Sequence, residues 1–85
     1  NTLDIGAQLQ LRETMRELAQ SGLGILLVTH HVSEIIPEIE RVVLLQEGRI
    51  LADGPKAAIL TAMNLSELFR ADVRLGQHEG YFHLY

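Results

Sequence analysis

The chain has 85 residues, of which 47% are hydrophobic, and its formal net charge is −4. This length allows one small domain, and the hydrophobic fraction is typical of a chain with a packed core. The acidic balance and the lack of a Lys/Arg run argue against nucleic-acid binding, and a chain without Cys has no disulfides or thiolate metal sites. The first residues show neither an initiator Met nor a signal-peptide pattern, so we expect a cytoplasmic chain that begins inside a longer protein.

A helix is predicted over residues 7–21. Asp4 is expected to cap its first turn, because the carboxylate can accept a backbone N–H there. Gly22 is expected to end it, since glycine adopts the left-handed conformation without a Cβ penalty. The apolar side chains recur every three or four residues, at Ala7, Leu11, Met15 and Leu18.

Residues 24–29 form a continuous apolar run that is followed by the pair His30 and His31. Such a run predicts a strand buried on both faces, as in a parallel sheet. A helix that leads into such a strand is half of a βαβ crossover, whose other half would precede Asn1. A buried strand without its neighbour would leave apolar surface bare, so we expect the isolated chain to self-associate.

The remaining pattern predicts short elements. A tight Glu47-Gly48 turn indicates an antiparallel hairpin, and Asn64 or Ser66 is expected to cap a helix that runs through Phe69. The predicted segments are a short helix at 32–36, strands at 41–46 and 49–52, a helix at 56–62 and a weak hairpin within 73–85.

His30 is the main candidate for chemistry. It follows the predicted buried strand, and ligand sites of parallel sheets gather at the carboxyl ends of strands. Imidazole can donate a hydrogen bond to a phosphate oxygen or to an attacking water, although an ordinary hydrogen bond is the alternative. A metal site is not expected, since neighbours along a strand face opposite ways and His78 and His83 lack carboxylate or thiolate companions at ligand spacing.

Three stretches, in this order, resemble one family. Asn1-Thr2-Leu3-Asp4 is similar to the D-loop that follows the Walker B motif in ATP-binding cassette (ABC) domains. Residues 25–30 resemble the strand that leads to their switch histidine, and residues 42–50 resemble the hairpin after it. The chain departs from many members at His31, where Asp is usual, and the histidine doublet resembles a bacterial subgroup associated with uptake of iron or metal oxyanions.

The resemblance implies an α/β fold that forms the C-terminal part of a P-loop NTPase, with a helix, a buried parallel-type strand, a β-hairpin and short C-terminal helices. Residues 1–62 would belong to the nucleotide-binding domain, and residues 63–85 would be a C-terminal extension. His30 would be catalytic, contacting the γ-phosphate of ATP and placing the attacking water. Asp4 would lie at the interface between two cassettes, and the role of His31 stays open.

The implied cofactors are ATP and Mg²⁺, held by the full-length domain. The implied partners are a second nucleotide-binding domain and an integral-membrane permease, at the cytoplasmic face of the membrane. The 85 residues contain no G-x-x-x-x-G-K-[ST] loop, Walker B carboxylates or signature motif. Because backbone N–H groups of that loop cradle the phosphates, we expect the chain alone to be inactive.

Two alternatives remain. One is a non-enzymatic α/β module that binds a protein partner, and the other is a cassette ATPase that acts in DNA repair or translation rather than in transport. The transported substrate and the direction of transport are left open by these residues.

Overall fold

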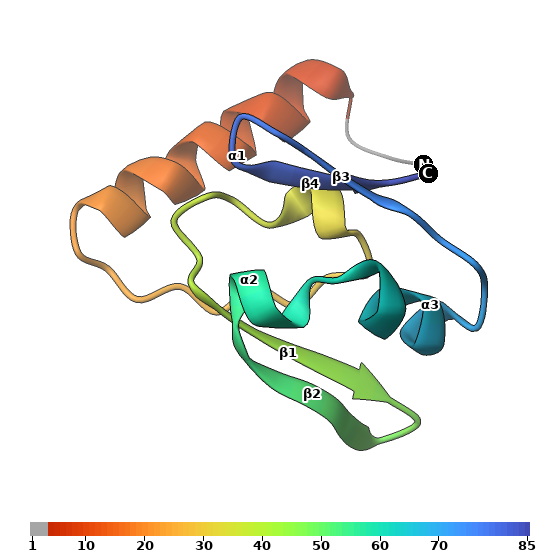
Figure 1. The fold of residues 1–85 in the computed structure, drawn as a ribbon. Helices are drawn as coiled ribbons and strands as arrows, with labels where there is room; N and C mark the ends of the chain where they lie inside the picture. The colour runs from red at the N-terminus through yellow and green to blue at the C-terminus, as the bar shows by residue number, and fades with distance from the viewer. Residues whose placement is uncertain (1–3) are drawn as a thin grey trace.

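The computed structural model describes residues 4–85 as a mixed α/β arrangement. Two antiparallel hairpins, β1–β2 and β3–β4, form separate two-stranded sheets with the short helices α2 and α3 between them (Figure 1). In the described range, no helix combines the length and the apolar character needed to cross a membrane. The elements are α1 (Ile5–Gln20), the 3₁₀ turn η1 (Val32–Glu34), β1 (Arg41–Gln46), β2 (Arg49–Pro55), α2 (Lys56–Ile59), α3 (Ala62–Phe69), β3 (Leu75–His78) and β4 (Tyr81–Leu84).

Helix α1 confirms the predicted N-terminal helix and its cap. The Asp4 carboxylate accepts the backbone N–H of Ala7 at 2.7 Å, and Gly22 follows the helix with φ of +95°. None of the residues of α1 is buried, and Ile5 and Leu11 are more than half exposed. The helix therefore lies on the body of the molecule without contributing to its core.

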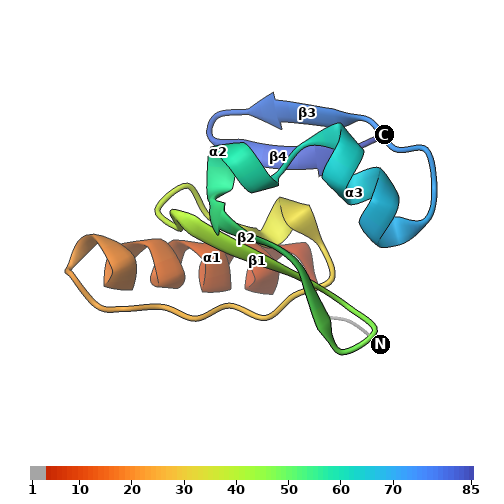
Figure 2. The same ribbon diagram turned by 60° about the horizontal axis from the view of Figure 1, so that its bottom comes forward.

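The predicted strand at residues 24–29 is wrong for this structure. The segment is irregular and unpaired, running back alongside α1, and the side chains of Leu26 and Val28 are 92% and 86% exposed (Figure 2). A parallel strand requires a neighbour that takes up its N–H and C=O groups, and residues 4–85 supply none. The bare apolar surface that the sequence predicted is present, and self-association stays a prediction.

Hairpin β1–β2 confirms the sequence reading of a tight glycine turn. Gln46 pairs with Arg49, and the two turn residues Glu47 and Gly48 have φ of +52° and +75°. Positive φ at both central positions is the turn geometry that matches the twist of a hairpin. Strand β2 continues beyond the predicted 49–52 to Pro55.

The helices after the hairpin differ in detail from the prediction. The expected 56–62 helix ends at Ile59, and the hydroxyl of Thr61 caps α3 by accepting the N–H of Asn64 at 3.1 Å. The predicted caps, Asn64 and Ser66, are therefore wrong. Ser66 lies inside α3, where its hydroxyl donates to the carbonyl of Val73 and accepts that residue's N–H. These two hydrogen bonds hold Val73 against α3, just before the tail hairpin β3–β4 begins. The tail hairpin confirms the prediction for residues 73–85.

The core joins the elements that surround η1. Leu65 of α3 is fully buried, and it packs with aliphatic side chains of the β1–β2 hairpin and of α2. Phe82 of β4 belongs to the same cluster, so the core draws on residues both before and after position 62. The cluster consists of Ile35, Val42, Leu44, Ile59, Leu60, Leu65 and Phe82.

Candidate functional site around His30

His30 lies at the start of a turn that is held by hydrogen bonds among Thr29, His31 and Glu34. The Thr29 hydroxyl donates to the Glu34 carboxylate and accepts the backbone N–H of His31 at 3.0 Å. The N–H of Glu34 in turn donates to the carbonyl of His31 at 3.1 Å, which begins η1. These bonds fix the backbone on the C-terminal side of His30, and the residue itself is exposed.

A cavity of about 220 Å³ adjoins this turn. Its wall consists of residues 30–33 on one side and of His83 and Leu84 on the other. Strand β4 lies beside η1 (Figure 1), so the two parts of the wall come from segments that are far apart in the sequence. Three histidines (His30, His31 and His83) and Ser33 therefore line one small space.

The position of His83 depends on a glycine in the opposite strand. His83 pairs with Gly76 across the β3–β4 hairpin, and a Cβ built on Gly76 would overlap the His83 ring. The ring centroid of Tyr85 lies 5.8 Å from that of His83. The proximity of His83 to His30 could not be predicted from the sequence, because no local pattern links residues so far apart in the chain.

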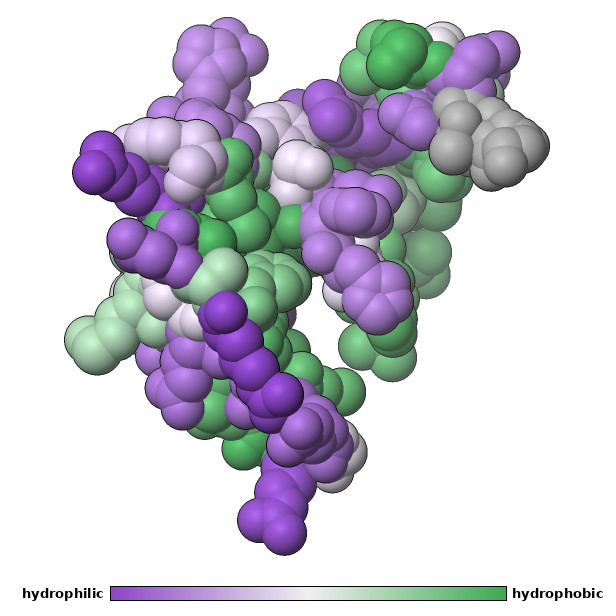
Figure 3. All heavy atoms as spheres, turned by 90° about the vertical axis from the view of Figure 1, so that its right-hand side faces the viewer, coloured by the Kyte–Doolittle hydropathy of each residue, from purple (hydrophilic) through white to green (hydrophobic). Residues whose placement is uncertain are grey.

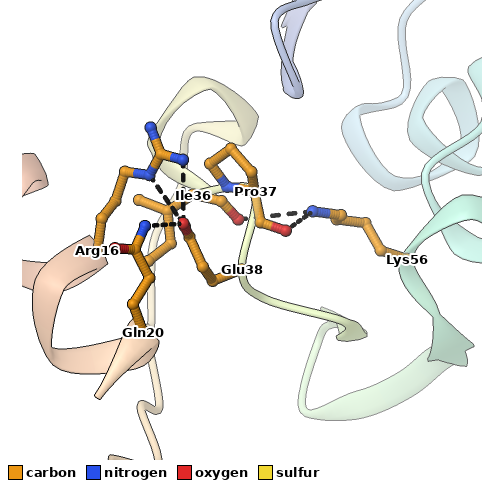
Figure 4. A network of polar contacts seen from close by, with 6 residues as sticks. All are labelled: Arg16, Gln20, Ile36, Pro37, Glu38 and Lys56. Carbon is orange, nitrogen blue, oxygen red and sulfur yellow. Dashed lines mark hydrogen bonds and ion pairs between the residues drawn. The ribbon is translucent and has the colours of Figure 1, made fainter. Parts of the chain in front are cut away.

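A polar network holds α1 and α2 against the loop that follows η1 (Figure 4). The Arg16 guanidinium donates to the Glu38 carboxylate at 3.0 Å, and the Gln20 amide donates to it at 2.7 Å. From the other side, Lys56 Nζ donates to the carbonyl of Pro37 at 3.1 Å. Since α1 buries no side chain, these bonds carry much of its attachment.

Hydrogen bonds from Arg16 and Gln20 lower the pKa of Glu38 from 4.5 to about 2. A carboxyl with a lowered pKa stabilises the fold fully above its unfolded pKa, and this contribution disappears as pH falls through the folded value. We expect Glu38→Gln to lose that contribution at pH 7, and the difference from the parent chain to vanish between about pH 4.5 and pH 2. Urea unfolding at several pH values measures it.

Hydrogen exchange of the α1 amides tests the location of the same effect. Exchange in α1 should accelerate more than exchange in β1–β2 when Glu38 is replaced. Glu13→Gln is the matched control, because Glu13 is an exposed carboxylate on α1. Equal effects of the two substitutions would contradict the anchoring role of Glu38.

A larger groove opens between the irregular segment and β1. Its volume is about 790 Å³, and it is lined by residues 25–32, by the whole of β1 and by α3 side chains that include Leu65 and Phe69. Figure 3 shows apolar side chains around the hollow on this face of the molecule. His30 lines both this groove and the smaller cavity, so it stands where the two meet.

The other predicted site residue, Asp4, lies away from these features. It caps α1 and lines neither the cavity nor the groove. The remaining D-loop residues, Asn1 to Leu3, lie outside the described residues. Among residues 4–85, no three His, Asp, Glu or Cys side chains come together as a metal site would need.

Comparison with known proteins shows similarity to one group of proteins along most of the chain. No family model matches, but the chain is 31% identical over 78 residues to the hemin import ATP-binding protein HmuV of Hahella chejuensis, covering 92% of this chain and 30% of that protein. It is 31% identical over 81 residues to the vitamin B12 import ATP-binding protein BtuD of Escherichia coli, covering 95% of this chain and 32% of that protein. The chain is a homologue of ABC transporter ATP-binding proteins.

A third relative supports the same family. The HmuV protein of Jannaschia sp. is 38% identical over 69 residues, which cover 81% of this ABC homologue and 26% of the relative. The chain thus spans about 30% of the length of the curated relatives it matches. The matches extend over most of the chain, including the His30 turn and the β1–β2 hairpin, so the resemblance first seen in short motifs is confirmed.

Proposed function

We propose that this ABC homologue is the switch-histidine part of an ATP-hydrolysing subunit that drives solute transport across a membrane. The main supporting observation is the exposed His30 beside a cavity, on a turn held by Thr29 and Glu34, in a chain homologous to ABC ATP-binding proteins. Because two of the relatives are named for hemin and vitamin B12 import, we propose uptake as the direction. The subunit would act at the cytoplasmic face of the membrane.

His30 would donate an imidazole N–H to the γ-phosphate and orient the attacking water. Phosphoryl transfer to water works mainly by positioning and by stabilising charge, so a histidine on a closed turn suits this role. Asp4 would lie at the contact with a second nucleotide-binding domain, and a permease would convert closure of the pair into transport.

The donors around the cavity fit the phosphate end of ATP. Three histidines and a serine line it, and no Asp or Glu side chain among residues 4–85 does. Mg²⁺ prefers oxygen ligands such as carboxylates, so groups outside this cavity would hold the ion. ATP supplies the phosphoryl group. The groove beside residues 25–30 supports the same proposal, because an unpaired apolar segment of strand length suits a place in a larger parallel sheet.

The interaction-module alternative has the groove as its one specific support. An apolar groove of this size also suits a protein partner, but it does not account for the homology to ATP-binding proteins along most of the chain. The ATPase proposal accounts for both observations.

A chimera tests the proposal. In it, this chain replaces the matching 81 residues of the E. coli BtuD protein. We expect the chimera to hydrolyse ATP in the presence of Mg²⁺, and the 85-residue chain alone to show no hydrolysis because it lacks a phosphate-binding loop. A folded chimera that binds ATP but does not hydrolyse it would contradict the proposal.

A further inference from the structure

The cavity beside His30 is lined by other polar residues that have no part in the proposed role of His30. His30, His31 and Ser33 line it from the turn, and His83 lines it from β4. A volume of about 220 Å³ corresponds to several water molecules at about 30 Å³ each, so a small polyatomic ligand fits. The chemistry of the wall indicates which kind of ligand this is.

An oxyanion matches this wall better than a metal ion does. Metal binding requires ligands that converge on one point, and the described residues hold no group of three that do so. A tetrahedral oxyanion offers several acceptor oxygens that point in different directions, so it can bind donors spread around a cavity. Neutral imidazole still has one N–H to donate, and protonated imidazole has two.

The C-terminal hairpin brings His83 to this wall. The missing side chain at Gly76 leaves room for the His83 ring, which a Cβ at that position would displace. Phe82, the preceding residue in β4, is buried in the core and attaches the strand to the rest of the molecule. The placement of His83 is therefore set by both the core and the cross-strand glycine.

We propose that His83 is a second phosphate-binding side chain, which acts together with His30 on a terminal phosphate group in this cavity. This inference rests on the proposed function, which supplies the phosphate chemistry, and assigns to the tail hairpin a part in binding it. The group bound is either the end of a polyphosphate chain or free phosphate after hydrolysis. Both present the same tetrahedral oxygens.

NMR titration of the 85-residue chain with inorganic phosphate, at fixed pH and ionic strength, tests the proposal. We expect the imidazole signals of His30 and His83 to shift together along one binding curve. His83→Gln should weaken phosphate binding about tenfold, the loss expected for one hydrogen bond to a charged group. His78→Gln is the matched control, since His78 belongs to the same hairpin, is 80% exposed and does not line the cavity.

Gly76→Ala tests the geometry while keeping the imidazole. The added methyl group should move the His83 ring away from the cavity and lower phosphate affinity, with the β3–β4 cross-strand contacts still visible in the spectrum. Parallel titration with tripolyphosphate separates the two forms of ligand: tighter binding indicates a terminal group of a chain, and weaker binding indicates free phosphate.

Other outcomes overturn the proposal in recognisable ways. If His30→Gln abolishes binding and His83→Gln leaves it unchanged, His83 has no role while the proposed function of His30 survives. If His78 shifts as much as His83, phosphate binds nonspecifically. If the chimera fails to hydrolyse ATP but His83-dependent phosphate binding persists, the ATPase proposal fails and the phosphate site stands.

Discussion

Replacing His30 by Ala in the BtuD chimera is expected to lower kcat by about 10²–10⁴-fold, the usual contribution of a positioned acid–base or hydrogen-bonding side chain. The affinity for ATP should stay within about twofold of that of the parent chimera, because the phosphate-binding loop is unchanged and provides most of the contacts with the phosphates. Steady-state hydrolysis and equilibrium ATP binding measure the two quantities separately.

The expected separation of binding from turnover follows from where His30 lies. Its backbone is fixed by the bonds of Thr29 and His31, while its exposed side chain contributes nothing to the core. Removal of the imidazole should therefore leave the fold intact. His78→Ala, in the exposed tip of the tail hairpin, controls for the loss of a histidine. Unchanged turnover in the His30 variant would show that His30 is not catalytic.

The features that the sequence predicted correctly have local causes. Asp4 caps α1 because its carboxylate reaches an N–H only three residues away, and the Glu47-Gly48 turn forms because glycine and its neighbour accept positive φ. Such signals lie within a few residues of each other, so a sequence shows them directly. The cap of α3 was predicted wrongly: the capping residue is Thr61, which precedes the helix, whereas the predicted caps Asn64 and Ser66 both lie inside it.

The feature that the sequence predicted wrongly depends on distant partners. Residues 24–29 have the composition of a buried strand, but a strand exists only when another strand pairs with it. The strands within residues 4–85 form only the two antiparallel hairpins, and neither hairpin includes this segment. Apolar composition alone therefore does not make a strand here, and Leu26 and Val28 remain exposed.

Of the two histidines proposed to bind phosphate, only His30 could be predicted from the sequence. His30 was found because a polar doublet follows an apolar run, which is a pattern within one stretch of sequence. His83 was missed because its proximity to the turn depends on how β4 packs against η1 and on the absence of a side chain at Gly76. No spacing rule connects these residues, so the cavity became visible only in three dimensions.

Leu65→Ala is expected to cost about 2–5 kcal/mol of unfolding free energy, the usual loss when a buried leucine is truncated and leaves a cavity. Leu65 has no exposed surface and packs among Ile35, Leu44 and Phe82, which belong to three different parts of the chain. A chain of this length is stabilised by about 4–13 kcal/mol in total, at about 0.05–0.15 kcal/mol per residue. The side chain of Leu65 alone is thus expected to account for a large fraction of the unfolding free energy.

Met63 provides the matched control for this substitution. It lies in the same helix, two positions earlier, and is 78% exposed. Met63→Ala should therefore change the unfolding free energy by no more than about 0.5 kcal/mol. Urea denaturation of both variants, followed by circular dichroism, compares them directly. Equal losses would mean that α3 does not pack into the core through Leu65. Phe82 of β4 belongs to the same cluster, so the core would then not attach β4 to the His30 turn in the way described above.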